Sequence, residues 1–231
     1  MYKKPSIIGR MFDIIAPTYD RLNTLLSFSI DKVWRKATIQ SIEIRPGDLI
    51  LDIATGTGAL ALLAVCCEGR VIGIDLSMQM LLRAASKARK HRLGSQYTVV
   101  QGDAISMPFR NETFDSAMVA FGVRNMENVE GFLDEICRVL KPHGRFSILE
   151  FSVPDRLPFR LIYLAYLTYV MPFIGSLISG NYEAYRYLRD SVMRFPAPKI
   201  LEGIIEARGF QIVQSLKLSG GISHLYLVEK Q

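Results

Sequence analysis

The sequence has few of the residues that bind metals or form disulfides. Its 231 residues include three cysteines and three histidines. Cys66 and Cys67 are adjacent and Cys137 is distant, so they match no metal-ligand spacing, and neighbouring cysteines can hardly bridge to each other. The histidines are also far apart in the sequence. We therefore expect no bound metal, and we interpret the cysteines as small core residues.

The sequence also lacks the signals of secretion and of nucleic-acid binding. Its start, "MYKKPSIIGRMFDIIAPTYD", contains no apolar run of signal-peptide length, which predicts a cytoplasmic protein. No zinc finger, aromatic RNA-binding signature or repeat is present, so we expect no nucleic-acid partner. Residues 1–45 hold eight Lys or Arg against four Asp or Glu, and residues 152–231 hold nine against six. Basic ends of this kind favour contact with an anionic membrane.

Short aliphatic runs alternate with longer stretches of helical periodicity. Helices are expected over 77–92 and 128–141, with Ser77 as a start signal and with Pro142 and Gly144 as stop signals. Such alternation is typical of βαβ units around a parallel sheet, whose strands are apolar because helices cover both faces. The expected strands are 49–54, 70–75, 97–103, 114–122 and 145–151.

The end of the chain has a different pattern. "GFQIVQSLKL" and "SHLYLVEK" read as two strands joined through "SGG", with no helix between them. This pattern predicts a hairpin added to the edge of the sheet, which makes the sheet mixed rather than purely parallel.

Residues 161–179, "LIYLAYLTYVMPFIGSLIS", form a 19-residue run without a charge. Its length qualifies it as a transmembrane candidate. Pro172, Gly175, the tyrosines and the hydroxyl groups oppose a span, as does its position inside a domain that resumes at 197–210. Three interpretations stay open: a true span, a buried helix pair, or an apolar cover over a hydrophobic ligand or membrane contact.

The stretch "LDIATGTGALA", residues 51–61, combines a strand, a glycine loop and the start of a helix. Gly56 and Gly58 let the backbone turn tightly and approach a ligand, and the following helix N-terminus offers unpaired N–H groups. Gly56-x-Gly58-x-x-Ala61 also satisfies the dinucleotide fingerprint, so an NAD(P)-dependent oxidoreductase is an alternative.

Three carboxylates lie at the ends of three consecutive expected strands. Asp52 precedes the glycine loop, where it would repel a pyrophosphate but attract an amino group or a sulfonium. Asp75 ends the second strand, where an acidic side chain can accept hydrogen bonds from both ribose hydroxyls. Asp103 in "QGDAISMPF" could accept from an adenine amino group. Each could instead be a helix cap or a loop carboxylate, but three at adjacent strand ends favour a ligand site.

A fourth strand end carries the neighbouring polar residues Arg124 and Asn125, in "FGVRN". In open α/β sheets, ligands bind at the carboxyl ends of the strands. The alternative is a solvated turn, because Arg is mostly exposed in proteins.

These segments together resemble a known family. "LDIATGTG", "VIGIDLSMQML", "GDAISMPF", "FDSAMVAFGVRN" and "RVLKPHGRFSILEF" resemble the class I S-adenosylmethionine-dependent methyltransferases. "YDRLNTLLSFSIDKVWR" and "FGVRN" resemble the two signatures of the ubiquinone/menaquinone biosynthesis C-methyltransferases, and 172–196 resembles their substrate-side insertion. The match covers nearly the whole chain.

The resemblance implies a fold and a domain organisation. The fold would be Rossmann-like α/β, with a seven-stranded mixed sheet and helices on both faces. A single domain, 1–231, would comprise an N-terminal helical lid (1–45), a cofactor-binding core (46–151), a substrate-side helical insertion (152–196) and a last helix with the hairpin (197–231).

The resemblance also implies a reaction and its site. S-adenosyl-L-methionine would be the cofactor, and a ring carbon of a polyprenyl quinol would accept the methyl group. The cofactor-binding residues would be Asp52, Gly56, Thr57, Gly58, Asp75, Asp103 and Ala104. Arg124 would stabilise the developing phenolate, Asn125 would hold a hydroxyl or a water, and Tyr19 and Asn23 would close the lid. Whether the chain forms a homo-oligomer stays open.

The sequence departs from the family pattern at several positions. Thr55, Ala59 and Ala120 replace a common Gly, Asp and Ser, and Ser29 and Asp31 replace the Gly and His of the first signature. These departures put substrate preference in doubt more than cofactor binding. A methyltransferase for another lipid or small phenol, and a scaffold without turnover, are further alternatives.

Overall fold

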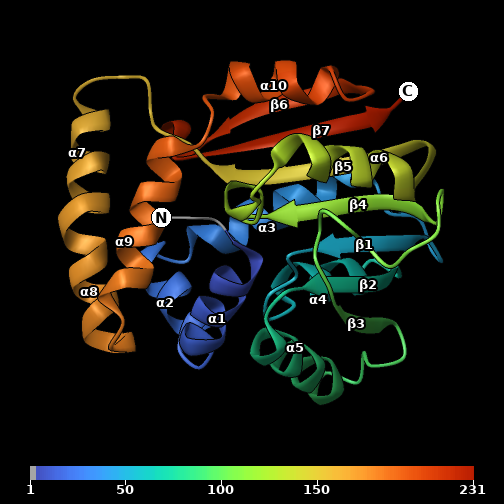
Figure 1. The fold of residues 1–231 in the computed structure, drawn as a ribbon, viewed down its shortest axis with the longest axis horizontal. Coiled ribbons are helices and arrows are strands. Elements are labelled where there is room, and N and C mark those ends of the chain that lie inside the picture. Colours follow the sequence, from blue (N-terminus) through green and yellow to red (C-terminus); the bar gives the residue numbers. More distant parts are fainter. Residues whose placement is uncertain (1–3) are drawn as a thin grey trace.

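The computed structural model describes residues 4–231, so the first three residues of the expected lid lie outside the described part. Its helices and strands follow one another along the chain as shown in Figure 1. In order they are α1 (Pro5–Ile15), α2 (Tyr19–Leu26), α3 (Ile30–Ile42), β1 (Leu49–Ile53), α4 (Ala59–Val65), β2 (Arg70–Asp75), α5 (Met78–Lys90), β3 (Tyr97–Gln101), β4 (Phe114–Ala120), η1 (Val123–Asn125), α6 (Val129–Val139), β5 (Leu140–Phe151), α7 (Phe159–Ala165), η2 (Tyr166–Val170), α8 (Met171–Ser179), α9 (Tyr182–Arg194), α10 (Pro198–Glu206), β6 (Phe210–Leu218), η3 (Ser219–Gly221) and β7 (Ser223–Lys230).

The strands form one seven-stranded sheet in the order β3-β2-β1-β4-β5-β7-β6. The first five strands are parallel, and β7 pairs antiparallel with both β5 and β6. The predicted mixed sheet with a C-terminal hairpin is therefore confirmed. The strand order reverses between β1 and β4, which is the place where open α/β sheets bind ligands.

The expected helix over 128–141 is too long. Helix α6 ends at Val139 because Leu140 already pairs with Phe114 of β4, so β5 begins there. Pro142 lies within this early part of β5, where the register between the two strands shifts. A bulge tolerates proline because the backbone N–H is not needed for the ladder.

Helices cover both faces of the sheet, which explains why the central strands are apolar on both sides. On one face, Ile39 of α3 and Leu60 and Ala64 of α4 pack with Ile50 and Val71 of the sheet. The cluster on the other face brings residues of α6 and α10 onto the same strands; its largest fully buried members include Phe114, Phe132, Phe146 and Phe210. These two clusters hold the strand ends in fixed positions.

The N-terminal helices and the insertion pack together at one end of the sheet. Ile15 and Leu22 share a buried cluster with Tyr163 and Leu167. In Figure 1, α7 and α8 form a column at the left, farther from the sheet than α9 and the N-terminal helices. The N-terminal helices and the insertion thus form a helical region over one end of the sheet.

Polar contacts join the N-terminal helices to the start of α5 on one side and to the insertion on the other. Asp13 of α1 accepts hydrogen bonds from the Ser77 hydroxyl at 2.6 Å and from the Gln79 amide at 3.0 Å, at the start of α5. The Tyr166 hydroxyl donates to the Leu26 carbonyl at the end of α2, at 2.6 Å. The N-terminal helices are therefore held between the sheet and the insertion.

The apolar run 161–179 is neither a buried helix pair nor a span in this fold. Phe159–Ser179 is long and apolar enough to cross a bilayer, yet only 28% of its most apolar window is buried. Strand β7, which follows this run in the chain, pairs with β5, which precedes it. Both flanking parts therefore lie on the same side of any bilayer, which leaves the third interpretation, an apolar cover over a hydrophobic ligand or a membrane contact.

Candidate active site

The glycine loop connects β1 to α4 through three left-handed residues, Ala54 with φ 49° and two glycines. Gly56 has φ 54° and Gly58 has φ 77°, a region that side chains other than glycine rarely adopt. A Cβ at Gly58 would also lie 3.1 Å from the ring of Tyr97. The loop geometry predicted for this stretch is therefore present.

A small cavity of about 70 Å³ lies beside this loop. Its wall includes Gly56 after β1, Asp75 at the end of β2, Asp103 and Ala104 after β3, and Asn125 after β4. The predicted convergence of the strand ends thus brings these five residues together. Ile8 and Phe12 of α1 add apolar walls.

Asp75 is tied to the backbone around the loop. Its Oδ2 accepts from the Gly56 amide at 2.8 Å, and its Oδ1 accepts from the Ser77 amide at 2.8 Å. Burial disfavours the charged carboxylate and raises the pKa of Asp75 to about 6, although the two amides act in the opposite direction. At neutral pH, the side chain is therefore a carboxylate with remaining lone pairs at the cavity wall.

Asp103 lies on the same wall but also shapes its own turn. Its Oδ1 accepts from the Ile105 amide at 3.1 Å. The structure thus combines the two interpretations of this residue, a loop carboxylate that also lines a cavity.

Asp52 and Thr57 do not line either cavity described here. The Asp52 side chain is buried and accepts from the Thr55 hydroxyl at 2.5 Å, and that hydroxyl also lies 2.7 Å from the Tyr97 hydroxyl. Burial raises the pKa of Asp52 to about 7. Asp52 lies on a strand that is buried on both faces, so its contact with a ligand group stays a prediction.

The side chain of Thr57 contacts helix α2 instead of the small cavity. Its hydroxyl donates to Oδ1 of Asp20 on α2 at 2.6 Å. Asp20 also forms an ion pair with Lys87 of α5 at 2.5 Å. Gly58 does not line the small cavity either, and its left-handed backbone conformation shapes the loop.

A larger cavity of about 290 Å³ adjoins the small one, since Phe12, Tyr19 and Phe121 line both. Its volume is near the lower end of ligand-binding cavities, roughly 300 Å³. The wall is mostly apolar and comes from the N-terminal helices, the ends of β4 and β5, and the insertion. Tyr19 and Asn23 of α2 both line it.

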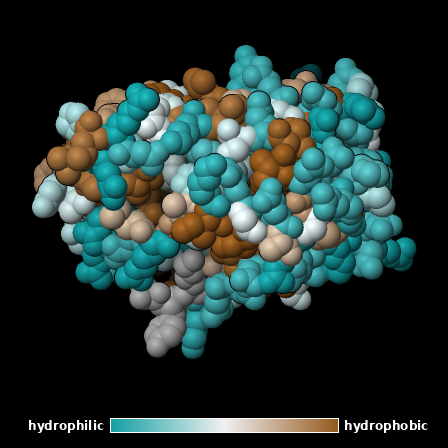
Figure 2. Space-filling view, turned by 90° about the horizontal axis from the view of Figure 1, so that it is seen from above, coloured by the Kyte–Doolittle hydropathy of each residue, from teal (hydrophilic) through white to brown (hydrophobic). Residues whose placement is uncertain are grey.

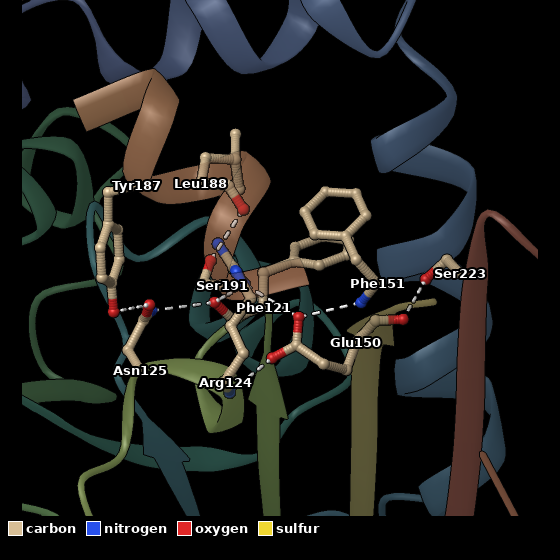
Figure 3. Close-up of polar contacts among 9 residues, drawn as sticks. All are labelled: Phe121, Arg124, Asn125, Glu150, Phe151, Tyr187, Leu188, Ser191 and Ser223. Carbon is tan, nitrogen blue, oxygen red and sulfur yellow. Dashed lines mark hydrogen bonds and ion pairs between the residues drawn. The ribbon is translucent and has the colours of Figure 1, made fainter. Parts of the chain in front are cut away.

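Arg124 reaches the wall of this cavity but is almost fully buried, with 6% exposure. Its Nη1 donates to Oε1 of Glu150 at 2.8 Å and to the Phe121 carbonyl (Figure 3). The Arg124 amide donates to the other Glu150 oxygen at 3.1 Å. "FGVRN" is therefore not a solvated turn.

Phe121 holds an uncommon backbone conformation beside these contacts. Its φ is 61°, in the left-handed region, where an aromatic residue is an outlier. Its ring stacks on Phe151 with centroids 4.3 Å apart, and the Arg124 guanidinium lies 5.2 Å from the Phe151 ring centroid. Strain of this kind clusters at functional sites.

Asn125 is oriented by a residue of the insertion. The Tyr187 hydroxyl donates to Oδ1 of Asn125 at 3.0 Å, and the Asn125 side chain donates weakly to the Phe121 carbonyl at 3.4 Å (Figure 3). Asn125 lines the small cavity whereas Arg124 lines the large one, so the pair stands at their junction.

Sequence reasoning missed Glu150, Tyr163 and Tyr187. Glu150 is 1% exposed and stands within the apolar strand "RFSILEF". A charged residue near the end of a buried strand was the available signal, because buried charges are normally paired. Tyr163 and Tyr187 belong to the insertion, whose helices give no indication of which face meets the cavity.

Comparisons with known proteins agree with this geometry. The model of the ubiE/COQ5 methyltransferase family matches residues 1–230. "Ubiquinone/menaquinone biosynthesis C-methyltransferase UbiE" of Syntrophotalea carbinolica is 44% identical over 94% of this chain and 91% of its own length. "Demethylmenaquinone methyltransferase" of Thermus thermophilus is 41% identical over 95% of this chain and 100% of its own length.

Two solved structures share the fold. The [4+2]-cyclase SpnF is 17% identical with a TM-score of 0.73, covering 96% of this chain and 94% of its own. A SAM dependent methyltransferase from Aquifex aeolicus is 17% identical with a TM-score of 0.63, covering 85% of this chain and 89% of its own. They confirm the predicted fold class. Together with the near-complete family match, these similarities confirm the resemblance: the chain belongs to the ubiE/COQ5 methyltransferase family.

Proposed function

We propose that this protein is an S-adenosylmethionine-dependent C-methyltransferase that methylates a ring carbon of a polyprenyl quinol. Demethylmenaquinol is the first candidate substrate, and the ubiquinone precursor is the alternative. The observation that carries the proposal is the junction of two unlike cavities, one with acidic groups and one almost wholly apolar, which share Phe12, Tyr19 and Phe121.

The small cavity fits the cofactor by its chemistry. Asp75 offers a carboxylate to ribose hydroxyls, Asp103 offers one to an amino group, and Ile8 and Phe12 offer apolar surface to a base. When bound, S-adenosylmethionine supplies an electrophilic methyl group on a sulfonium. A carboxylate at the position of Asp75 would serve an NAD ribose equally well, so the family match rather than this wall disfavours the NAD(P) alternative.

The large cavity fits the other reactant. A quinol ring carbon becomes nucleophilic when the adjacent hydroxyl loses its proton, and a cation near that oxygen favours the anionic form. Arg124 is such a cation, and its guanidinium stays protonated at any working pH. The apolar walls exclude water from this charge and accommodate an isoprenoid chain, at about 0.8 kcal/mol for each CH₂ group buried.

The direct test is methyl transfer by the purified protein. A reduced demethylnaphthoquinol, a demethoxybenzoquinol and a simple phenol should be incubated separately with S-adenosylmethionine and analysed by mass spectrometry. The proposal expects the gain of one carbon-bound methyl group on a quinol. Methylation of the simple phenol alone would support the other-phenol alternative and contradict the proposal.

Asp75→Ala should weaken cofactor binding, because hydrogen bonds to a charged group contribute roughly 1.5–3 kcal/mol. Calorimetry with S-adenosylhomocysteine measures this loss. Since the pKa of Asp75 is raised to about 6, the wild-type affinity should also fall as the pH is lowered through that value, and the variant should lack this part of the pH dependence. Asp155→Asn, at an exposed carboxylate paired with Lys217, is the control. If Asp75→Ala and wild type bound S-adenosylhomocysteine with equal affinity, Asp75 would not be a cofactor-binding residue.

The exposed apolar side chains support a further part of the proposal, contact with an anionic membrane. Leu161, Phe173 and Leu177 of α7 and α8 are 60%, 68% and 76% exposed. In Figure 2, hydrophobic residues are visible among hydrophilic ones at the left end, where α7 and α8 lie in Figure 1, and others lie near the middle of the same face. Arg156, just before α7, and Arg160, in its first turn, are exposed cations that complement anionic headgroups. A long-tailed quinol resides in such a bilayer.

The double variant Phe173→Asp/Leu177→Asp should bind anionic vesicles less tightly than wild type. Burial of each such side chain is worth roughly 1.5–3 kcal/mol, so the loss should exceed tenfold. Vesicle co-sedimentation measures binding, and turnover of a long-tailed quinol should fall more than that of a tail-less one. Leu82→Asp on α5, 54% exposed and far from α7 in Figure 1, is the matched control. Equal losses in both variants would show that the apolar helices have no special role.

A further inference from the structure

Three buried polar groups on the wall of the large cavity lack a hydrogen-bond partner among the described residues, and one of them, Nε of Arg35, lies 3.6 Å from Oδ2 of Asp31 in an ion pair. The other two are the Tyr163 hydroxyl on α7 and Nε of Arg124. Both residues line the cavity, and each is 6% exposed. An unsatisfied buried polar group costs about 1–3 kcal/mol, so native proteins keep few of them. Two at one cavity indicate a shared acceptor.

The other polar groups nearby already have partners. Nη1 of Arg124 is engaged by Glu150 and the Phe121 carbonyl, and Oδ1 of Asn125 accepts from Tyr187. The Tyr166 hydroxyl donates to the Leu26 carbonyl at the end of α2. Arg124 Nε and the Tyr163 hydroxyl remain as buried donors of this cavity that have neither a hydrogen bond nor an ion-pair contact of their own among the described residues.

Tyr163 is in its protonated, donating form. Burial raises the pKa of Tyr163 well above its usual range, although the positive charge of Arg124 acts in the opposite direction. The charge of Glu150 and the neighbouring Tyr166 raise it further. These effects also show that Tyr163 lies within electrostatic reach of the Arg124–Glu150 pair.

We propose that Tyr163 is a catalytic residue whose hydroxyl donates to the quinol ring oxygen that Arg124 stabilises. This inference rests on the proposed function and extends it to a residue of the apolar insertion. Two donors then converge on one oxygen as it gains negative charge, and Tyr163 keeps its proton throughout. The insertion supplies a polar contact as well as an apolar cover.

Tyr163→Phe removes only the donor oxygen and keeps the ring in its packing site. We expect kcat for a tail-less quinol to fall roughly 10- to 10²-fold, below the full effect of losing an oxyanion donor because Arg124 remains. The KM for the quinol should change little, since the contact strengthens in the transition state. Tyr182→Phe, 50% exposed and outside both cavity walls, is the matched control and should retain full turnover.

A second measurement separates this role from a packing role and from the proposed function. The absorbance of 4-nitro-1-naphthol reports its ionisation, and two donors should lower the pKa of the bound phenol relative to the free one. Tyr163→Phe should bring the bound pKa back toward the free value. If Tyr163 had only a packing role, Tyr163→Phe would lower the affinity for the phenol and for the phenolate alike. The pKa of the bound phenol would then be the same as in wild type.

The outcomes distinguish the two claims. Normal kcat together with an unchanged bound pKa in Tyr163→Phe would overturn the inference while wild-type turnover of the quinol upholds the proposed function. The wild-type protein could instead lower the pKa of the bound phenol through Tyr163 but methylate no quinol. That result would support the binding site for a phenol oxygen and overturn the proposed function.

Discussion

Arg124→Ala should lower kcat for quinol methylation roughly 10²- to 10³-fold, the usual effect of losing one donor to a developing oxyanion. The interaction strengthens as the quinol oxygen gains charge, so kcat should change far more than cofactor affinity. Arg124→Lys should recover only part of the activity, because an ammonium cannot present the planar fork that serves Glu150, the Phe121 carbonyl and a ring oxygen at once. The loss should shrink as pH rises, since hydroxide then helps to form the phenolate.

The measurement is a pH–rate profile of wild type and both variants with saturating S-adenosylmethionine. Calorimetry with S-adenosylhomocysteine must show that each variant still folds and binds cofactor, because removing Arg124 leaves Glu150 buried without its partner. A folded Arg124→Ala protein with near-normal kcat at neutral pH would show that this arginine is structural.

Glu150→Ala should lower the free energy of unfolding by roughly 3–5 kcal/mol, because it leaves the buried Arg124 charge without its carboxylate. The Arg124→Ala/Glu150→Ala double variant should recover part of this loss, since it removes the orphaned charge as well. Trp34, the single tryptophan of the sequence, is buried and reports urea unfolding by its fluorescence. Strictly additive losses in the double-mutant cycle would mean that the two side chains are not energetically coupled.

Glu150→Gln separates charge from position. The amide retains an acceptor for Nη1 of Arg124 and for the Phe151 amide, the two donors that now share Oε1. If Glu150 acts by holding the guanidinium, Glu150→Gln should retain more activity than Glu150→Ala. A higher kcat in Glu150→Gln than in wild type would instead show that the carboxylate mainly attenuates the charge of Arg124.

Local patterns in the sequence predicted most of the sheet. The five parallel strands end within two residues of the expected positions, because runs of β-branched residues and glycine turns are local signals. Asp75, Asp103 and Arg124 reach cavity walls for the same reason, since parallel strands end at a common edge. The roles assigned to these residues stay predictions.

Contacts between distant segments were beyond sequence reasoning. Asp52 lies in a strand whose residues are nearly all buried, so no alternation indicates whether its side chain meets a ligand or Thr55. Thr57 donates to Asp20, 37 positions away, and Arg124 pairs with Glu150, 26 positions away. Such pairs depend on how helices dock onto the sheet, which hydrophobic periodicity does not specify.

The N-terminal helices impose a thermodynamic relation between the two ligands. Helix α2 is tied to the glycine loop through Asp20 and Thr57, and to the insertion through Leu26 and Tyr166. Tyr19 stands on the walls of both cavities. A ligand that contacts α2 in one cavity therefore stabilises the helix in the position that the other cavity requires. Cofactor and quinol should then bind with positive heterotropic coupling, and each must raise the affinity for the other by the same factor.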